Sequence, residues 1–168
     1  GECLLQADFV RGILAECRLR GINTAIETSL HVPWSNVERI LPLLDTIFVD
    51  LKHPDPEMHK KYTGAGNGLL LDNLTRLDAS DFFGSLHLRI PLIPGINDDD
   101  ATLCRMLDIA SDLSQLREIE ILPYHRLGIT TYEWLQREYE LSELRSPAPE
   151  YIQERVDFMR KRNVVAVP

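Results

Sequence analysis

Apolar residues recur along the chain at two different spacings, and the two spacings alternate. Segments within residues 9–17, 37–44, 70–77, 103–113 and 152–159 place apolar side chains every three or four positions, which is typical of amphipathic helices. Short, nearly continuous apolar runs lie between these segments and predict strands. The predicted strands are residues 23–28, 46–51, 86–93, 118–122 and 164–167.

Several residues indicate where the predicted helices begin and end. Gly21 suits the position just after the first helix, and Ser35 or Asn36 can cap the second. Pro42 is expected to kink or shorten that second helix, whereas Pro149 is expected to open the last one.

Five strands separated by four helical segments predict an α/β fold with a parallel sheet or barrel. The strands are apolar rather than cleanly alternating, which is typical of a sheet covered on both faces. Residues 1–168 are expected to form a single domain, because the proline-containing stretch 147–149 reads as the end of a long surface loop, 125–148, rather than as a linker.

Composition narrows the class of protein. The 168 residues are 44% apolar, which argues against disorder, and no apolar run approaches the roughly 20 residues that span a bilayer. A formal net charge of −8 argues against non-specific binding to nucleic acid or anionic lipid. The three cysteines are too few and too scattered for a disulfide framework or a zinc site, which suits a reducing cytoplasm.

Polar residues gather where the predicted strands end. Ligand sites of parallel α/β folds lie at the carboxyl ends of strands, so these residues are candidates for a site. Structural ion pairs also occur at such positions, but the repetition over four strands favours a site. The candidates are Glu27, Thr28, Ser29, Asp50, Lys52, Arg89, Tyr124 and His125.

Other chemistry-bearing residues favour structural roles. The glycine-rich residues 64–68 do not follow a strand, so they predict a turn rather than a dinucleotide loop. The run Asn-Asp-Asp-Asp at 97–100 precedes a helix and predicts capping rather than metal binding. His53, His59 and His87 lack ligand-like spacing. For Tyr132, Trp134 and Tyr139, packing and the rim of a partner site remain equally open.

An ordered set of motifs resembles the radical S-adenosylmethionine (SAM) enzymes that activate glycyl-radical enzymes, such as those of the pyruvate formate-lyase type. The set runs nearly from end to end: Gly-Glu-Cys-Leu-Leu-Gln at 1–6, Gly-Ile at 21–22, Glu-Thr at 27–28, Phe-Val-Asp-Leu-Lys at 48–52, Arg-Ile-Pro-Leu-Ile-Pro-Gly at 89–95 with Asn-Asp at 97–98, and Leu-Pro-Tyr-His-Arg-Leu-Gly at 122–128.

The resemblance implies a partial (β/α) barrel and a SAM site built from matching positions. Gly1 and Glu2 match the end of a Gly-Gly-Glu motif whose polar groups hold the SAM amino group. Thr28 and Ser29 match positions near the methionine moiety, although Ser29 stands where relatives often have asparagine.

The same resemblance assigns the remaining strand ends. Asp50 and Lys52 match an Asp-x-Lys motif that approaches SAM, Arg89 matches an arginine near the SAM carboxylate, and His125 matches a histidine near the ribose. A candidate monovalent-cation site is implied at Glu27, Thr28 and Asp50.

The implied activity is reductive SAM cleavage followed by hydrogen abstraction from a glycine of a partner, a glycyl-radical enzyme of formate acetyltransferase type. A donor such as flavodoxin would supply the electron. The C-x3-C-x2-C motif that holds the family's [4Fe-4S] cluster is absent, and Cys3 stands where proline is usual. The chain is therefore expected to be the C-terminal part of a barrel truncated at its N-terminus, and to be inactive alone.

Two other functions remain open from the residues. Lys52 could be the Schiff-base nucleophile of an aldolase-like barrel, activated by desolvation. Alternatively, the chain could be a non-catalytic barrel that binds a partner protein.

Overall fold

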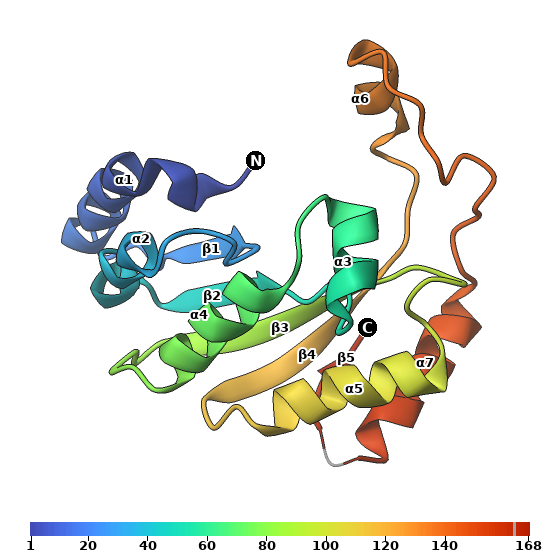
Figure 1. Cartoon of the computed structure of the whole chain (residues 1–168). Helices are drawn as coiled ribbons and strands as arrows, with labels where there is room; N and C mark the ends of the chain where they lie inside the picture. The colour runs from blue at the N-terminus through green and yellow to red at the C-terminus, as the bar shows by residue number, and fades with distance from the viewer. Residues whose placement is uncertain (163) are drawn as a thin grey trace.

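Five strands form one sheet in the order β1-β2-β3-β4-β5, and each neighbouring pair is parallel. The computed structural model describes residues 1–162 and 164–168, and Figure 1 shows the sheet with its helices. The strands are β1 (Ala25–Thr28), β2 (Thr46–Asp50), β3 (Ser85–Leu92), β4 (Leu116–Pro123) and β5 (Ala166–Val167). The five predicted strands and the parallel α/β architecture are confirmed.

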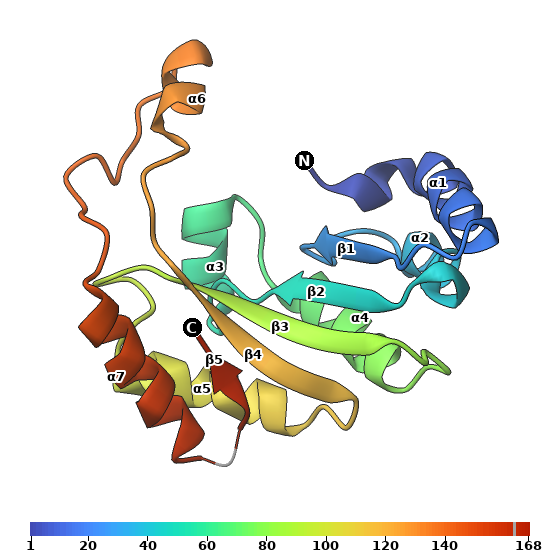
Figure 2. The ribbon, with the colours of Figure 1, turned by 180° about the vertical axis from the view of Figure 1, so that it is seen from behind.

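Helices connect the strands and cover one face of the sheet. Helices α3, α4 and α5 lie in front of the strands in Figure 1, whereas Figure 2 shows the strands open to the viewer on the opposite face. The helices are α1 (Ala7–Leu19), α2 (Trp34–Glu38), α3 (Pro56–Thr63), α4 (Gly68–Asp78), α5 (Asp100–Ser111), α6 (Ile129–Trp134) and α7 (Pro149–Arg160), with short 3-10 helices η1 (Cys3–Gln6) and η2 (Leu41–Leu43). None of the helices in the described ranges is long and apolar enough to cross a membrane.

Burial alternates strictly along β2 and β3, so the prediction of a sheet covered on both faces is wrong. Ile47 and Val49 of β2 are fully buried toward the helices, whereas Phe48 and Asp50 are half-buried on the opposite face. β3 repeats the pattern over eight residues. Because successive side chains point to opposite faces, one face of the sheet carries the core and the other carries polar and aromatic groups.

The second predicted helix is shorter than its apolar stripe. Helix α2 begins after Pro33, so neither Ser35 nor Asn36 caps it, and that prediction is wrong. Asn36 instead donates its side-chain amide to the carbonyl of Leu4 at 2.9 Å. Pro42 lies in η2, which confirms that the proline shortens the α-helix.

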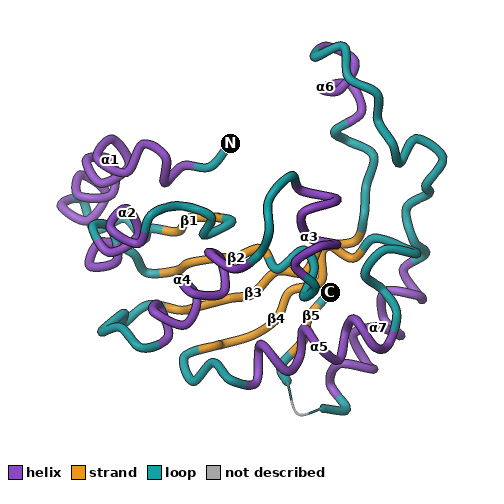
Figure 3. The backbone as a smooth tube through the Cα atoms, in the orientation of Figure 1, coloured by secondary structure: helices purple, strands orange, loops and turns teal. Residues whose placement is uncertain are grey.

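Two helices lie in segments that apolar spacing did not predict, as the purple segments in Figure 3 show. Helix α3 is polar, and its signals are local: Asp55 Oδ1 accepts the amides of Glu57 and Met58, and Gly64 ends the helix with φ +88°. Helix α6 forms within the predicted loop 125–148. The turn predicted at residues 64–68 is confirmed, since it joins α3 to α4.

Candidate functional site

A hollow of about 350 Å³ lies at the carboxyl ends of the first three strands. Its lining unites seven of the eight predicted SAM-binding residues, and Glu27 joins them. The parallel strands place these side chains at one edge of the sheet, which is where ligands of α/β folds bind. The lining residues are Gly1, Glu2, Glu27, Thr28, Ser29, Asp50, Lys52 and Arg89.

Arg89 links three strands through two carboxylates. Its Nη1 lies 2.7 Å from Glu27 Oε1, and its Nη2 lies 3.1 Å from Asp50 Oδ1, because Asp50 and Arg89 are register partners. The guanidinium also lies over the Phe48 ring, 5.6 Å from its centroid. The hydrogen bond from Arg89 holds the pKa of Glu27 below its ordinary value. Arg89 is therefore fixed in place, with a side chain only 13% exposed.

Lys52 is held less tightly than Arg89. Its Nζ lies 3.8 Å from Asp50 Oδ2, beyond hydrogen-bond distance, and its side chain is 44% exposed. Its backbone is fixed, however, because Asn97 Nδ2 donates to the Lys52 carbonyl at 2.9 Å. The Lys52 ammonium can therefore turn toward a ligand while its strand end stays in place.

Glu2 connects η1 to the end of β1 through its carboxylate. Oε1 accepts hydrogen bonds from the Leu4 amide and Thr28 Oγ1, at 3.1 and 2.9 Å. Oε2 accepts the Ser29 amide and hydroxyl, at 2.9 and 2.7 Å. Burial raises the pKa of Glu2, but the hydrogen bonds from Ser29, Leu4 and Thr28 together lower it below its ordinary value. Both carboxylate oxygens of Glu2 are therefore occupied by hydrogen bonds from the protein itself.

The turn after β1 contains a left-handed residue, Leu30, that the sequence did not predict. Leu30 has φ +50°, a left-handed conformation that favours glycine, although its side chain is fully buried. The buried side chain of Asn73 on α4 donates to the carbonyls of Leu30 and Val32, both at 2.8 Å. Asn73 therefore holds the turn that presents Thr28 and Ser29 to the hollow.

His125 does not line the hollow that the other candidates form. It is exposed after the end of β4, where its Nδ1 accepts the Leu127 amide at 3.4 Å. The structure therefore does not bring His125 to the other predicted SAM residues, and its role near a ribose stays a prediction.

The aromatic residues of 125–148 differ in their surroundings: Tyr139 is packed against other tyrosines, whereas Trp134 is exposed. The Tyr139 hydroxyl lies 2.7 Å from that of Tyr124, and the Tyr139 ring packs on Tyr132 at 4.9 Å between centroids. These contacts give Tyr139 a packing role, whereas Trp134 is 80% exposed on α6.

Within the described residues, no group of three or more histidine, cysteine, aspartate or glutamate side chains could hold a metal ion. The structural interpretation of the histidines is confirmed: His53 accepts the Asp55 amide, His59 contacts the Ala65 carbonyl, and His87 pairs with Glu118 at 3.1 Å. The capping interpretation of residues 97–100 holds for Asp99, whose side chain accepts the Thr102 amide.

Asn73 and Asn97 are positioning residues that sequence reasoning missed. Both side chains are almost fully buried. Asn73 lies within the apolar stripe of α4, beside Leu74, and an amide in such a stripe is the signal that could have identified it. Asn97 belongs to the motif set and to the capping run, but neither pattern predicts that its side chain holds backbone groups.

A family model and individual relatives both relate this chain to radical SAM activating enzymes. The sequence model of the Radical SAM superfamily matches residues 1–107. The chain is 38% identical to the (2S)-3-sulfopropanediol dehydratase activating enzyme of Klebsiella oxytoca, over 99% of this chain and 54% of that protein. It is 41% identical to the 4-hydroxyphenylacetate decarboxylase activating enzyme of Clostridioides difficile, over 85% of this chain and 45% of that protein. The chain thus spans about half the length of the curated relatives it matches.

A solved structure agrees with the sequence comparisons. A domain of pyruvate-formate lyase-activating enzyme from Bacteroides vulgatus superposes with a TM-score of 0.80 at 27% identity, covering 99% of this chain and 93% of that one. The parallel sheet matches the partial barrel of that neighbour. Since the family model covers well over half of the residues, the chain belongs to the radical SAM superfamily.

Proposed function

We propose that this chain is the SAM-binding part of an activating enzyme that generates a glycyl radical in a partner enzyme. The observation that carries the proposal is the convergence of seven predicted SAM residues in one hollow. The relatives support the reaction class, because proteins 34–41% identical to this chain are activating enzymes.

The charges of the hollow fit SAM. Three carboxylates (Glu2, Glu27 and Asp50) face two cations (Lys52 and Arg89), so the lining side chains carry a net charge of −1. SAM combines a zwitterionic amino acid with a sulfonium and carries a net charge of +1. Its ammonium needs acceptors and its carboxylate needs donors, and this lining offers both.

Individual residues would divide the work of binding. Lys52, which is half-exposed and lies 3.8 Å from Asp50, would pair with the SAM carboxylate, while Arg89 keeps Asp50 oriented from the neighbouring strand. Because Glu2 is saturated by internal donors, its role would be to hold η1 against the site, leaving Asp50 as the acceptor for the ammonium. When bound beside a [4Fe-4S] cluster, SAM supplies the 5′-deoxyadenosyl radical of this family.

The cysteines of this chain do not fit a cluster. Cys3 and Cys17, the nearest pair in sequence, are fourteen positions apart, and neither belongs to a metal-binding group among the described residues. The cluster ligands of the proposed enzyme therefore lie outside this chain, and this chain alone is expected not to cleave SAM.

The proposal extends to the partner enzyme, the electron donor, the compartment and a monovalent cation. The partner would be a glycyl-radical enzyme of formate acetyltransferase type, the electron donor a flavodoxin, and the compartment the cytoplasm. A monovalent cation at Glu27, Thr28 and Asp50 would have to share both carboxylates with Arg89, which already lies between them. Potassium is therefore expected to weaken the Arg89 pairs if it binds there.

Two measurements test the proposal. Isothermal titration calorimetry of this chain should give saturable SAM binding, and Asp50→Asn should weaken it by about tenfold, since a charge-assisted hydrogen bond is lost. The complete gene product, reconstituted anaerobically and mixed with SAM and its partner, should release 5′-deoxyadenosine and give a glycyl radical in electron paramagnetic resonance. If the complete protein binds the partner but never cleaves SAM, the non-catalytic alternative is correct.

The aldolase-like alternative makes a different prediction. A Schiff-base lysine depends on desolvation, whereas the Lys52 side chain is 44% exposed beside a carboxylate. Borohydride trapping of a carbonyl compound on Lys52, with no SAM binding, would favour that alternative over the proposed activity.

A further inference from the structure

A second cavity, of about 720 Å³, lies at the opposite end of the sheet from the SAM hollow. Asp45 and Gly84, which directly precede β2 and β3, form part of its lining, so it lies at the amino ends of these strands. Its walls come from α2 and η2 on one side and from the connection between α4 and β3 on the other. None of the residues assigned to SAM lines it.

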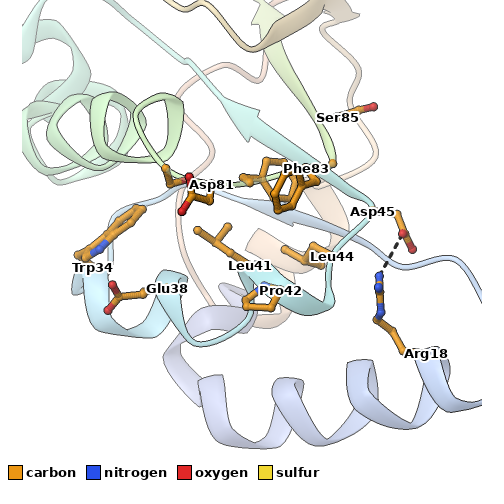
Figure 4. A pocket seen from close by; sticks show the side chains of 13 residues that line it. Arg18, Trp34, Glu38, Leu41, Pro42, Leu44, Asp45, Asp81, Phe83 and Ser85 are labelled. Atoms are coloured by element: carbon orange, nitrogen blue, oxygen red, sulfur yellow. Dashed lines mark hydrogen bonds and ion pairs between the residues drawn. The ribbon is translucent and has the colours of Figure 1, made fainter.

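Aromatic and aliphatic side chains make most of the wall. Trp34 is half-buried, Phe82 is almost fully buried, and Leu41 and Pro42 of η2 add aliphatic surface to the wall. Figure 4 shows Trp34 and Phe83 on different sides of the cavity. Phe83 is 98% exposed although it lines the cavity, so it lies at the rim.

The wall beside Phe82 is shaped by a glycine. A Cβ at Gly84 would come within 2.6 Å of the Asp45 carbonyl and would also collide with the Phe82 ring. The Phe82 ring can therefore pack on the backbone at Gly84 only because that residue has no side chain.

The carboxylates of the cavity fall into two groups. Asp45 is satisfied: its Oδ2 accepts the Thr24 amide at 2.8 Å, and its Oδ1 lies 3.3 Å from Arg18 Nη1. The side chains of Glu38 and Asp81 make no hydrogen bond or ion pair with any other described residue, and Figure 4 shows both carboxylates toward the Trp34 side of the cavity. The cavity thus combines an indole face with two carboxylates whose charge is not neutralised by the protein.

We propose that this cavity binds a small organic cation, an amine or guanidinium with an apolar body. The cation would lie over the Trp34 ring between Glu38 and Asp81, where both the π-system and the carboxylates attract positive charge. The apolar body would pack on Leu41, Pro42 and Phe83. A cavity of this volume lies within the range of small-molecule sites, which are mostly apolar with a few placed polar groups.

Trp34 itself reports on the test. Trp34 and Trp134 are the two tryptophans of the chain, and Trp134 is exposed on α6, so Trp134→Phe leaves Trp34 as the single emitter. Titration of this variant with phenethylammonium should change the emission saturably. Phenethyl alcohol, which has the same body without the charge, should bind about tenfold more weakly.

Matched variants localise the effect. Glu38→Gln and Asp81→Asn should each weaken phenethylammonium binding by about threefold or more, and circular dichroism should stay unchanged because both residues are exposed. Asp72→Asn removes one negative charge from an exposed residue of α4 outside the cavity and should leave the affinity unchanged. The proposal is overturned if the emission change does not saturate, if the alcohol binds as tightly as the cation, or if Asp72→Asn weakens binding as much as Asp81→Asn does.

Discussion

The Glu2 carboxylate holds the turn η1 to the end of β1, and its charge state controls that link. Its pKa is held below the ordinary 4.5 in the folded state, so its contribution to stability is complete above pH 4.5 and is lost as the pH falls through the folded value. We expect Glu2→Gln to lower the free energy of unfolding at pH 7 by about 1–3 kcal/mol. Urea denaturation measures this change.

The pH dependence separates charge from shape at this position. The stability curves of Glu2→Gln and the unmodified chain should converge as the pH falls below 4.5, because the protonated carboxyl no longer differs in charge from the amide. Glu16→Gln, which breaks an exposed pair with Arg20, should change stability by less than about 0.5 kcal/mol. A constant difference between the two curves at every pH would contradict the electrostatic account.

Lys52 should affect ligand binding far more than stability. Because its ammonium is half-exposed and only loosely paired, Lys52→Met should change the free energy of unfolding by less than about 0.5 kcal/mol. The same substitution should weaken SAM binding by about tenfold, since it removes a cation from the lining of the hollow. Calorimetry of Lys52→Met beside Lys60→Met, on the exposed face of α3, measures the contrast. Equal SAM affinities for the two variants would remove Lys52 from the site.

At the residue scale, the sequence predicted which strand-end residues converge but not how they pair. Asp50, Lys52 and Arg89 follow from strand alternation and the parallel sheet, because their positions depend on local periodicity. The saturation of Glu2 depends on contacts 26 and 27 residues away, and no local pattern encodes such a distance. His125 was placed by resemblance alone, and the structure does not bring it to the hollow.

At the scale of elements, Asn97 ties the end of β2 to the end of β3. Its Nδ2 donates to the carbonyls of Lys52 and Pro91, at 2.9 and 2.8 Å, and its Oδ1 accepts the Ile93 amide at 2.7 Å. The residue is fully buried. Asn97→Ala should therefore destabilise the fold by about 2–4 kcal/mol, because three part-buried backbone groups lose a partner.

Asn97→Asp sharpens this prediction. A carboxylate has the same size but cannot donate to the two carbonyls, so the aspartate variant should be at least as unstable as Asn97→Ala at neutral pH and should recover stability as the pH falls. Urea denaturation at two pH values measures the effect, with exposed Asn23→Ala as the neutral reference. An aspartate variant as stable as the unmodified chain would mean that water replaces the lost donors.

Element prediction succeeded where apolar spacing is strong and failed where the signal is local. Helices α4, α5 and α7 carry buried stripes that their spacing reveals. Helix α3 has one buried residue, His59, so its cap at Asp55 and its end at Gly64 are the main evidence for it in the sequence. The alternation of buried and half-buried side chains along the strands was not predicted. Phe48, which is half-buried, is apolar and so resembles a core residue in the sequence.

At the scale of the whole molecule, the helix-covered face of the sheet is a continuous core, whereas the outer face of α1 is apolar and exposed. Phe9 and Ile13 are 66% and 49% exposed, and Ile22, which is 52% exposed, extends the same surface. Contiguous apolar patches on a surface favour association. We therefore expect the isolated chain to self-associate at about 100 μM, as sedimentation velocity would show.

The double variant Phe9→Glu with Ile13→Glu should sediment as a monomer at the same concentration, because each substitution places a charge on the α1 patch. Its thermal midpoint should change little, since Phe9 and Ile13 are 66% and 49% exposed and their removal leaves no cavity in the core. Leu127→Glu is the control: it adds a charge to an apolar residue that is 82% exposed and lies between β4 and α6, away from α1. If this control abolishes association and the α1 variant does not, the contact lies on the segment that carries α6, and the α1 patch is only exposed surface.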